Sequence, residues 1–484
     1  MNGRSFLRSG WAIAGAGAIG LAVKLLLALK TYGTNDVYSY QQFAVWSRYL
    51  GVDLYHVDPL FNHPPSMIHV LQAMDWLSRA TGLSFSFWLR LPAILADAAN
   101  LWLVWKLLGE RVRERSIFWA LLLLAVTPTL ILISGFHGNT DSLVMFFVLL
   151  SVYLIQRDGN VWAAGAALGL AHCVKIYPLI AAPAIVLNLR GWPQRIKFCA
   201  AAGAAVLIGW SPFLFQDPHA VLGQVFGYRS AYGMWGIAYM LDQLSAAAPR
   251  LTPLNTAFQH FGAYVSLGLV WLVSWRMSRR EPRPPLFSQI GLAFFLFLAV
   301  ASGFGVQYLA WLAPWVVEQG WIAAGLFYAS SGVFLFQVYN LWAEGLPWYL
   351  ADSYNLGTFV GYTDYAQLIC WVSLLAVLGL AVKRLFRLPS VAVRWRWAGA
   401  AAAAALLWAI VPPQLPAPEP TGNKYEPAVR SINARSYLDL AGVLLDRGQY
   451  RESIEAARAA AALTDEAAAE ASGIIAADEA ALPH

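Results

Sequence analysis

Residues 11–38 read WAIAGAGAIGLAVKLLLALKTYGTNDVY, an apolar run followed at once by a polar stretch that contains an acid. The apolar part, Trp11–Leu29, has about the length that an α-helix needs to cross the hydrocarbon core of a bilayer. A backbone inside lipid must satisfy its own hydrogen bonds, and a helix does so. The stretch therefore predicts a membrane helix that ends shortly before the carboxyl group of Asp36.

Apolar runs of similar length recur along most of the 484 residues. The chain is 59% hydrophobic and 12% charged, whereas soluble proteins are about 45–50% apolar and about 25% charged. This composition excludes a disordered chain, a disulfide-rich secreted scaffold and a cytosolic enzyme. We predict an all-α polytopic membrane protein with about 13 transmembrane helices. Their expected spans are 11–29, 88–107, 117–135, 142–156, 161–175, 177–189, 198–215, 259–275, 286–303, 306–318, 321–340, 366–382 and 397–411.

Lysines and arginines gather in the loops on one side of these spans. That side carries 18 positive residues and the opposite loops carry 6, so the positive-inside rule places the N-terminus in the cytoplasm and the C-terminal tail outside. We therefore expect a multi-pass protein of the cytoplasmic membrane whose first helix is retained rather than cleaved as a signal peptide. The basic residues belong to membrane-flanking loops, and a nucleic-acid partner has no support.

The composition divides the chain into three segments. Residues 1–411 form the membrane domain, 412–433 a Pro-rich linker, and 434–484 a soluble helical tail. The tail resembles one tetratricopeptide helix–turn–helix repeat in its small and apolar positions, Leu440, Ala441, Leu444, Gly448, Tyr450, Ser453 and Ala460. A plain helical hairpin is an equally good interpretation. Because one repeat cannot bury its own face, the tail is expected to dock on this protein or on a protein partner.

Most of the polar sequence lies in the loops expected outside, above all in residues 30–87. Within that first loop, Val37–Leu50 and Ser66–Ser78 carry apolar residues at helical spacing. They predict amphipathic helices along the membrane surface. The three cysteines have no ligand-like spacing and indicate neither a metal site nor a redox compartment.

Asp36 is the first candidate for chemistry. A carboxylate at the membrane boundary is costly to desolvate unless it is paired or functional. The alternative is a structural role, in which Asn35 or Asp36 caps the helix over 37–50 by accepting a backbone N–H. The two roles are compatible, because a cap also fixes the direction of a carboxylate.

Two further polar motifs lie in the outer loops. Residues 55–65 read YHVDPLFNHPP and hold two histidines and Asp58, but no pair has the spacing of a zinc-binding helix, so turn formation is favoured. His63 remains a binding candidate. Residues 136–142 read FHGNTDS, in which Thr140 or Asp141 is expected to cap the following helix. Turn chemistry explains every residue of that motif except His137.

Isolated cations in the outer loops suit a phosphate ligand. Lys175 follows an apolar segment, where snorkelling toward the interface is the alternative role. Arg229 lies in an aromatic loop, and either side chain could donate charge-assisted hydrogen bonds. Gln307 and Tyr308 stand at the outer start of a helix, where an interfacial aromatic belt would also account for Tyr308 and Trp311.

In this order, the motifs resemble the GT-C class of membrane glycosyltransferases, which take sugars from polyprenyl-phosphate carriers. The resemblance runs over about residues 5–411 and rests on Asn35-Asp36, the stretch 61–65, the turn 137–142, the segment 175–178, and Gln307-Tyr308. Within this class, the chain is similar to bacterial polyprenol-phosphate-dependent mannosyl- and glucosyltransferases. The tail lies outside it.

The resemblance implies an inverting enzyme that transfers a hexose, mannose or glucose, to a glycan, lipid or protein acceptor outside the membrane. Asp36 matches the general base of the class. Lys175 and Arg229 are candidates for the donor phosphate, and His63, His137, Asp141, Gln307 and Tyr308 for donor or substrate binding. Some members bind a divalent metal through an Asp-x-Asp motif, which the outer loops lack; Asp58 and Asp141 are the carboxylates that could serve instead.

Two other functions remain open at this point. A flippase or transporter of lipid-linked sugars would show internal repeats and broken helices, and no clear repeat is present. A polysaccharide polymerase or ligase would be expected to use outer-loop Arg and His, which are sparse here. Polar residues concentrated in one long outer loop favour surface chemistry over passage through the membrane.

Overall fold

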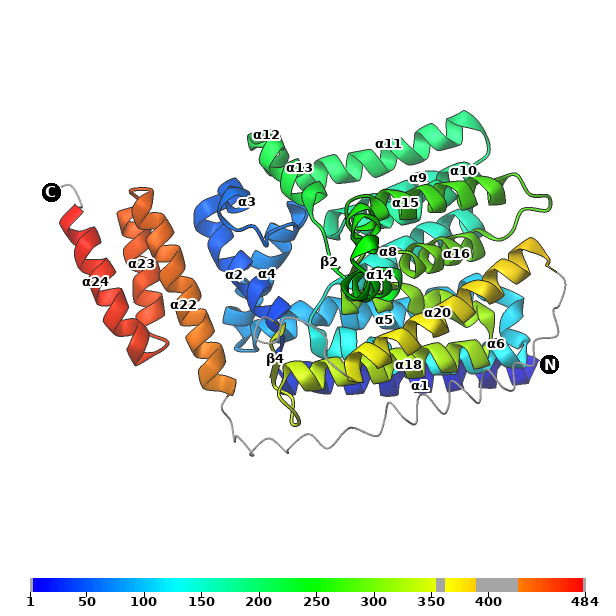
Figure 1. Cartoon of the computed structure of the whole chain (residues 1–484), viewed down its shortest axis with the longest axis horizontal. Coiled ribbons are helices and arrows are strands. Elements are labelled where there is room, and N and C mark those ends of the chain that lie inside the picture. Colours follow the sequence, from blue (N-terminus) through cyan, green and yellow to red (C-terminus); the bar gives the residue numbers. More distant parts are fainter. Residues whose placement is uncertain (1–2, 354–361, 389–424, 482–484) are drawn as a thin grey trace.

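The computed structural model describes residues 3–353, 362–388 and 425–481. Most of its helices run side by side as one bundle (Figure 1). These helices are α1 (Gly3–Lys30), α5 (Phe85–Leu108), α6 (Arg115–Ala125), α7 (Pro128–Leu130), α8 (Asp141–Tyr153), α9 (Val161–Val174), α10 (Ala182–Asn188), α11 (Gly191–Trp210), α15 (Thr252–Ser278), α16 (Leu286–Ala299), α17 (Leu309–Val316), α18 (Trp321–Trp342) and α20 (Tyr362–Phe386). A π-helical segment, Ile131–His137, continues α7.

The all-α, polytopic membrane architecture is confirmed. Six helical stretches in the described part of the chain are long and apolar enough to cross a membrane: Gly10–Lys30, Phe85–Arg113, Arg115–His137, Pro249–Ser278, Trp321–Trp342 and Thr363–Phe386. Helices α9 and α16 are shorter and apolar. Each predicted span up to residue 382 overlaps at least one helix, but 286–303 runs past the end of α16 at Ala299 and 198–215 is broken after Trp210. The span 397–411 lies outside the described residues. The count of 13 stays a prediction.

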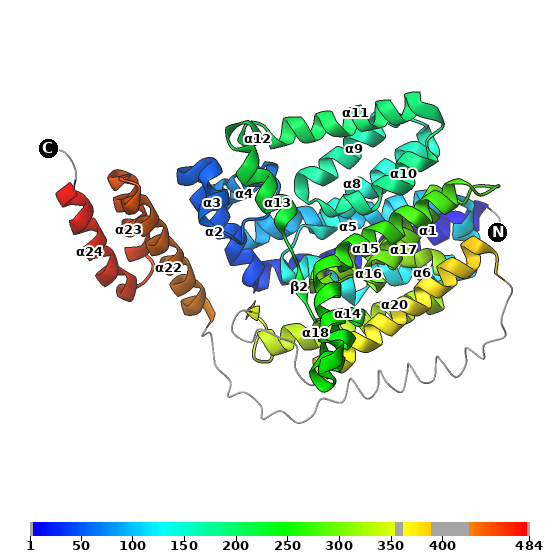
Figure 2. The ribbon, with the colours of Figure 1, turned by 45° about the horizontal axis from the view of Figure 1, so that its top comes forward.

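Shorter helices gather at the end of the bundle opposite the N-terminus (Figures 1 and 2). They are α2 (Asn35–Leu50), α3 (Leu54–Val57), α4 (Ser66–Thr81), α12 (Phe213–Gln216) and α13 (Pro218–Gly227); α14 (Gly236–Ala247) follows in the same loop as α13. The two helices predicted in the first outer loop are confirmed as α2 and α4. Helix α2 buries the expected apolar side chains, Val37, Tyr40, Phe43 and Ala44.

Two short strand pairs connect segments that are far apart in the sequence. β1 (Gly33–Thr34) pairs in parallel with β4 (Leu350–Ala351), and β2 (Ala231–Tyr232) pairs antiparallel with β3 (Gly303–Phe304). The first pair fixes the start of α2. The second brings the loop of Arg229 to the segment that carries Gln307 and Tyr308.

Glycines allow α9 and α11 to approach closely. A Cβ atom on Gly165 would lie 2.3 Å from the carbonyl oxygen of Phe198, and one on Gly169 would lie 2.5 Å from that of Ala202. Small residues spaced by four are typical of membrane helices that pack backbone to backbone. This contact fixes the C-terminal end of α9, which is followed by Lys175.

The C-terminal tail forms three helices, α22 (Tyr425–Asp446), α23 (Tyr450–Ala461) and α24 (Asp465–Ala481). Gly448, with φ of 71°, makes the turn between the first two, as expected. Helix α22 begins inside the segment 412–433, which was predicted to be linker. Pro427 is compatible with this start, because proline is tolerated in the first helical turn. The tetratricopeptide relationship stays a prediction.

Candidate active site

Asp36 lies in the first turn of α2, but its carboxylate is not the helix cap. The cap is Thr34, whose hydroxyl oxygen accepts a hydrogen bond from the backbone N–H of Asp36. The expectation that Asn35 or Asp36 caps this helix is therefore wrong. Asn35 instead accepts hydrogen bonds from the backbone and hydroxyl of Ser353. The carboxylate of Asp36 is left available for other contacts.

Two glycines let the start of α2 meet the turn between the π-helical segment and α8. Gly33 has φ of 112°, and a Cβ atom there would lie 2.7 Å from the carbonyl oxygen of Phe136. Gly138 has φ of 85°, and its Cβ atom would lie 2.4 Å from Val37. Any other residue would be strained at these φ values and would force the segments apart. The hydroxyl of Thr34 donates to the carbonyl oxygen of His137 and closes the contact at 2.8 Å.

This contact places His137 beside Asp36. The Nε2 atom of His137 lies 3.0 Å from Oδ2 of Asp36, and its Nδ1 atom lies 2.9 Å from the hydroxyl of Tyr339 on α18. An ionised carboxylate only accepts hydrogen bonds, so Nε2–H is the donor to Asp36. His137 is nearly fully buried, at 3% exposed, and both of its ring nitrogens have partners. The imidazole is therefore held in one orientation.

Asn139 connects Asp36 to Lys175. Its Nδ2 donates to Oδ2 of Asp36 over 2.8 Å, and its Oδ1 accepts from the ammonium of Lys175 over 2.5 Å. The same oxygen accepts from the backbone N–H of Thr140 over 2.7 Å. Two donors on one side fix which end of the amide is oxygen. One side chain thus orients both the acid and the cation.

Asp141 is fully buried and neutralises Lys175. Its Oδ2 lies 2.8 Å from the ammonium, and its Oδ1 accepts from the indole N–H of Trp311 over 2.5 Å. The expected capping by Thr140 or Asp141 is wrong, because Thr140 makes no side-chain cap hydrogen bond and Asp141 is used elsewhere. The description of Lys175 as an unpaired cation is wrong as well.

An aromatic stack backs Asp141. The rings of Tyr177 and Trp311 stack with centroids 3.9 Å apart, and Tyr308 stacks on the same indole at 4.0 Å. Trp311 is 3% exposed and Tyr308 is 9% exposed, so they are not an interfacial aromatic belt. The alternative interpretation of Tyr308 and Trp311 as interfacial belt residues is therefore wrong. The stack forms one wall of the polar cluster.

The loop of Arg229 reaches the far side of this stack. Ser230 shares a hydrogen bond with the hydroxyl of Tyr308, next to the β2–β3 pair. Arg229 itself is exposed and has no ion-pair partner within residues 3–353, 362–388 and 425–481. Gln307 is partly buried in the adjoining segment, where a Cβ atom on Gly305 would contact its amide. The structure therefore brings the Arg229 and Gln307 segments to the cluster through Tyr308.

The electrostatics of the cluster keep Asp36 ionised. Burial raises the pKa of Asp36, but His137, Lys175 and Asn139 together lower it below its usual value. The Asp36 side chain is still 31% exposed, so the carboxylate is recessed yet reachable from outside the protein. Burial alone would lower the pKa of Lys175, and the adjacent Asp141 more than reverses this. Both groups carry their full charge at neutral pH.

His63 lies near the cluster as a neutral imidazole. Burial and the nearby Lys175 ammonium lower the pKa of His63 to about 3, although Asp36 opposes the shift. The imidazole ring packs on the ring of Tyr40 with centroids 4.9 Å apart. The backbone carbonyl oxygen of His63 accepts a hydrogen bond from the hydroxyl of Tyr55. A neutral histidine can bind a sugar hydroxyl but adds no positive charge for a phosphate.

Asp58 lies apart from this cluster. Its carboxylate accepts from the side chain of Gln42 and from the backbone of Leu60, both over 2.9 Å, so it has the turn-forming role. Burial raises the pKa of Asp58. Among the residues that the structure describes, no three His, Cys, Asp or Glu side chains gather in a group able to hold a metal ion.

Sequence reasoning missed several residues of the cluster. Asn139 was interpreted only as part of a turn, although an amide between His137 and Asp141 was a usable signal. Tyr177 was quoted only as part of the segment after Lys175. Tyr339 lies within an apolar membrane helix, where nothing in the local sequence marks it.

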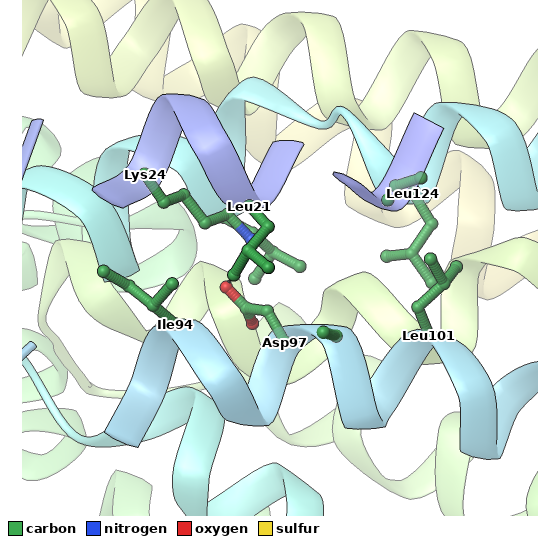
Figure 3. Close-up of a pocket in the computed structure, with 10 residues that line it drawn as sticks. Leu21, Lys24, Ile94, Asp97, Leu101 and Leu124 are labelled. Carbon is green, nitrogen blue, oxygen red and sulfur yellow. Dashed lines mark hydrogen bonds and ion pairs between the residues drawn. The ribbon is translucent and has the colours of Figure 1, made fainter. Parts of the chain in front are cut away.

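A second charged pair lies inside the bundle, away from the cluster. Lys24 of α1 and Asp97 of α5 point toward one another among Leu21, Ile94 and other apolar residues (Figure 3). These side chains line a cavity of about 20 Å³. The charged atoms of Lys24 and Asp97 are 2.5 Å apart, and both side chains are almost fully buried. Oδ1 of Asp97 is buried without a hydrogen-bond partner in the described structure.

Arg90, the other buried ionisable residue of α5, does not pair with Asp97. Two helical turns separate these residues by about 10 Å along α5. Arg90 is fully buried and donates instead to carbonyl oxygens at the ends of two segments, those of Ala28, Thr31, Gly135 and Phe136. Its role is to join α1 to the π-helical segment.

Comparisons with known proteins point to a common enzyme class. The family model of Glycosyltransferase family 87 matches residues 61–301, a range that contains His63, His137, Asn139, Asp141, Lys175 and Arg229 and begins after Asp36. GPI mannosyltransferase 1 of Trypanosoma brucei brucei is 24% identical over 348 residues, which cover 64% of this chain and 76% of that protein. GPI mannosyltransferase 1 of Eremothecium gossypii is 24% identical over 362 residues, covering 68% of this chain and 85% of that protein.

Among solved structures, ArnT from Cupriavidus metallidurans bound to undecaprenyl phosphate aligns over 83% of this chain and 76% of that chain, with a TM-score of 0.44 and 14% identity. The family match and the two mannosyltransferase relatives agree with the helical membrane fold and with the class that the motifs resemble. The protein is a polytopic membrane glycosyltransferase, as the family match and the two relatives together indicate.

Proposed function

We propose that the protein transfers mannose, with inversion, from a polyprenyl-phosphate carrier to a hydroxyl group of an extracytoplasmic glycan, lipid or protein. The acceptor oxygen attacks the anomeric carbon and passes its proton to Asp36. The bond between that carbon and the phosphate oxygen breaks, and the electron pair leaves with the carrier phosphate. One base and one phosphate site suffice for a single displacement.

The observation that carries this proposal is the environment of Asp36. The carboxylate is ionised, partly exposed and held by His137 and Asn139, so it can accept a proton from a substrate hydroxyl that comes within hydrogen-bond distance. Asp36 follows the end of α1 by six residues, and its helix α2 lies at the bundle end opposite the N-terminus (Figure 1). Together with the charge bias of the loops, this position supports an active site on the outer side of the membrane.

The two candidate cations for the leaving phosphate, Lys175 and Arg229, differ in how far nearby carboxylates neutralise them. The charge of Lys175 is balanced by Asp141, and the nearby Asp36 adds a second negative charge. Arg229 is exposed and carries no such partner within the described residues. We therefore assign the phosphate chiefly to Arg229, with Lys175 as the fixed donor at the base of the site.

The sugar assignment rests on the relatives, because both are named mannosyltransferases. The donor's lipid phosphate rests on the resemblance of the motifs and on the two cations. A flippase has no comparable support, because the polar cluster contains a positioned acid beside the bilayer boundary.

Purified protein supplied with polyprenyl-phosphate mannose, glucose and arabinose in turn, with a mixture of acceptors, tests the proposal. We expect transfer from the mannose donor, and we expect Asp36→Asn to lower kcat by about 10²–10⁴-fold. Asp242→Asn, an exposed acid in another outer loop, is the matched control and retains activity. Full activity of Asp36→Asn, or movement of the donor across vesicles without covalent transfer, contradicts the proposal.

A further inference from the structure

The C-terminal tail is a helical unit whose three helices pack on one another. Helices α22, α23 and α24 bury small and apolar side chains against one another, among them Leu440, Leu444, Ala457 and Ala471. Arg435 bonds to Asp439 on its own helix and to Glu470 on α24. No large apolar side chain of the tail is exposed among its described residues. The buried apolar residues of the tail belong to one hydrophobic cluster with those of α2, and polar contacts add to this packing.

Helix α22 lies beside α2 at the end of the bundle, and both views show the tail next to α2 and α3 (Figures 1 and 2). The indole N–H of Trp46 donates to the backbone carbonyl oxygen of Ser436 over 3.2 Å. Trp46 is 6% exposed, although it belongs to an outer loop. A buried indole needs a partner for its N–H, and the tail supplies it.

A second contact lies just after the end of α2. Arg447, at the C-terminal end of α22, forms an ion pair with Asp53 over 2.6 Å. Between the two contacts, the hydroxyl of Tyr437 lies within electrostatic range of Arg48 and Arg79. The tail therefore holds the C-terminal half of α2 and the turn that follows it.

The opposite end of α2 is held by the membrane domain. Thr34 bonds to His137, Asn35 bonds to Ser353, and the β1–β4 pair precedes the helix. Asp36 and Trp46 are ten residues apart, which is about 15 Å along one rigid helix. A tilt of α2 at the Trp46 end is therefore transmitted to the carboxylate at the other end.

We propose that the tail, residues 425–481, is a positioning module that docks on α2 and the turn at Asp53 and thereby holds Asp36 in its productive orientation. The functional part of this inference rests on the proposed glycosyl transfer. No tail residue is assigned a contact with the reacting groups. The tail lies outside the resemblance and outside the residues 61–301 that the family model matches.

The docking is tested by charge reversal in the full chain. Nitroxide labels at two exposed positions, Leu60 in the first loop and Glu466 in the tail, report the distance between the two parts, with the native cysteines replaced. We expect a narrow distance distribution in the parent and a broad one in Arg447→Asp. The double variant Asp53→Arg with Arg447→Asp restores the ion pair and the narrow distribution. Arg451→Asp, the same charge change on an exposed residue of α23, leaves it unchanged.

The positioning role is tested on the same variants by kinetics and by amide hydrogen exchange of α2. Arg447→Asp is expected to lower kcat by roughly 10- to 100-fold with little change in KM, because a misplacement of about 1 Å costs up to about 10²-fold. Exchange of the α2 amides is expected to accelerate. The double charge reversal is expected to recover both, which a simple loss of folding would not do.

The outcomes separate the two proposals. An undocked Arg447→Asp with parental kcat and parental α2 exchange overturns the positioning role. A narrow distance distribution in that variant overturns docking through this ion pair. If the parent transfers no sugar, the proposed function fails, and the exchange of α2 still decides whether the tail holds that helix.

Discussion

The ammonium of Lys175 lies 2.5 Å from the amide oxygen of Asn139, and this contact turns the amide NH₂ toward Asp36. The cation and the acid are therefore oriented by a single side chain from the turn between two membrane segments. A change at Asn139 therefore acts directly on both partners.

Substitutions of Asn139 separate its two contacts. Asn139→Asp keeps an acceptor for Lys175 but removes the donor to Asp36 and places a second negative charge beside it. Asn139→Leu removes both contacts. Since an unsatisfied buried partner costs about 1–3 kcal/mol, we expect each variant to lower kcat by about 10- to 100-fold. Steady-state kinetics check this, and parental kcat in Asn139→Leu would show that the amide does not orient the acid.

The pH profile reports the influence of His137 on Asp36. The pKa of Asp36 is held below its usual value of 3.8, so we expect kcat to stay level through neutral pH and to fall only below that value. The lowered pKa also means that ionised Asp36 stabilises the folded state. This stabilisation is present at pH values above the pKa of Asp36 in the unfolded chain, and it is lost as the pH falls through the lower pKa of the folded protein.

His137→Gln keeps a hydrogen-bond donor but removes the imidazole, which lowers the pKa of Asp36. The pKa of Asp36 should rise, and the acid limb of the kcat profile should move to higher pH. His172→Gln, a histidine on α9 outside the cluster, serves as the control. An unchanged acid limb in His137→Gln would show that His137 does not lower the pKa of Asp36.

Arg229 is expected to bind the donor phosphate. Because a hydrogen bond to a charged group contributes about 1.5–3 kcal/mol, Arg229→Gln should raise the KM for the lipid-linked donor by about 10- to 100-fold. Arg229→Lys should recover part of the loss, since it keeps the charge but not the bidentate geometry. Arg250→Gln, another exposed outer-loop arginine, is the matched control. Equal KM values for Arg229→Gln and the parent would move the phosphate site to Lys175.

The buried pair Lys24–Asp97 predicts a characteristic pattern of stability. Lys24→Leu alone or Asp97→Leu alone leaves an unpaired buried charge, and each should lower the free energy of unfolding by about 3–5 kcal/mol. The double variant replaces the pair by apolar side chains and should be close to the parent. Thermal unfolding in detergent measures all three proteins. If the losses of the two single variants added up in the double variant, Lys24 and Asp97 would stabilise the fold separately and not as an ion pair.

The membrane helices and α2 were predictable because each is specified by its own local pattern. An apolar run near 20 residues, or apolar side chains at helical spacing, needs no knowledge of the rest of the chain. Asp36 was found for the same reason, since it directly follows such a run. Even there the cap was misplaced, because Thr34 competes with Asn35 and Asp36 within three adjacent polar positions.

The contacts of the site were not predictable, because they join distant segments. Tyr339 reaches His137 from within α18, and Trp311 reaches Asp141 from α17. Lys175 was identified, but its neutralisation by Asp141 depends on the close packing of α9 that Gly165 and Gly169 permit. Which charges remain free is a property of the assembled bundle.

The pairing of Gly33 with Leu350 bears on the biosynthesis of the enzyme. A ribosome adds about 5–20 residues per second, so the partner strand emerges tens of seconds after Asp36 has passed into the membrane. During that interval the start of α2 lacks its β4 partner. A nascent chain that stops before Leu350 cannot form the β1–β4 pair that precedes Asp36. The proposed active site is therefore completed late in translation.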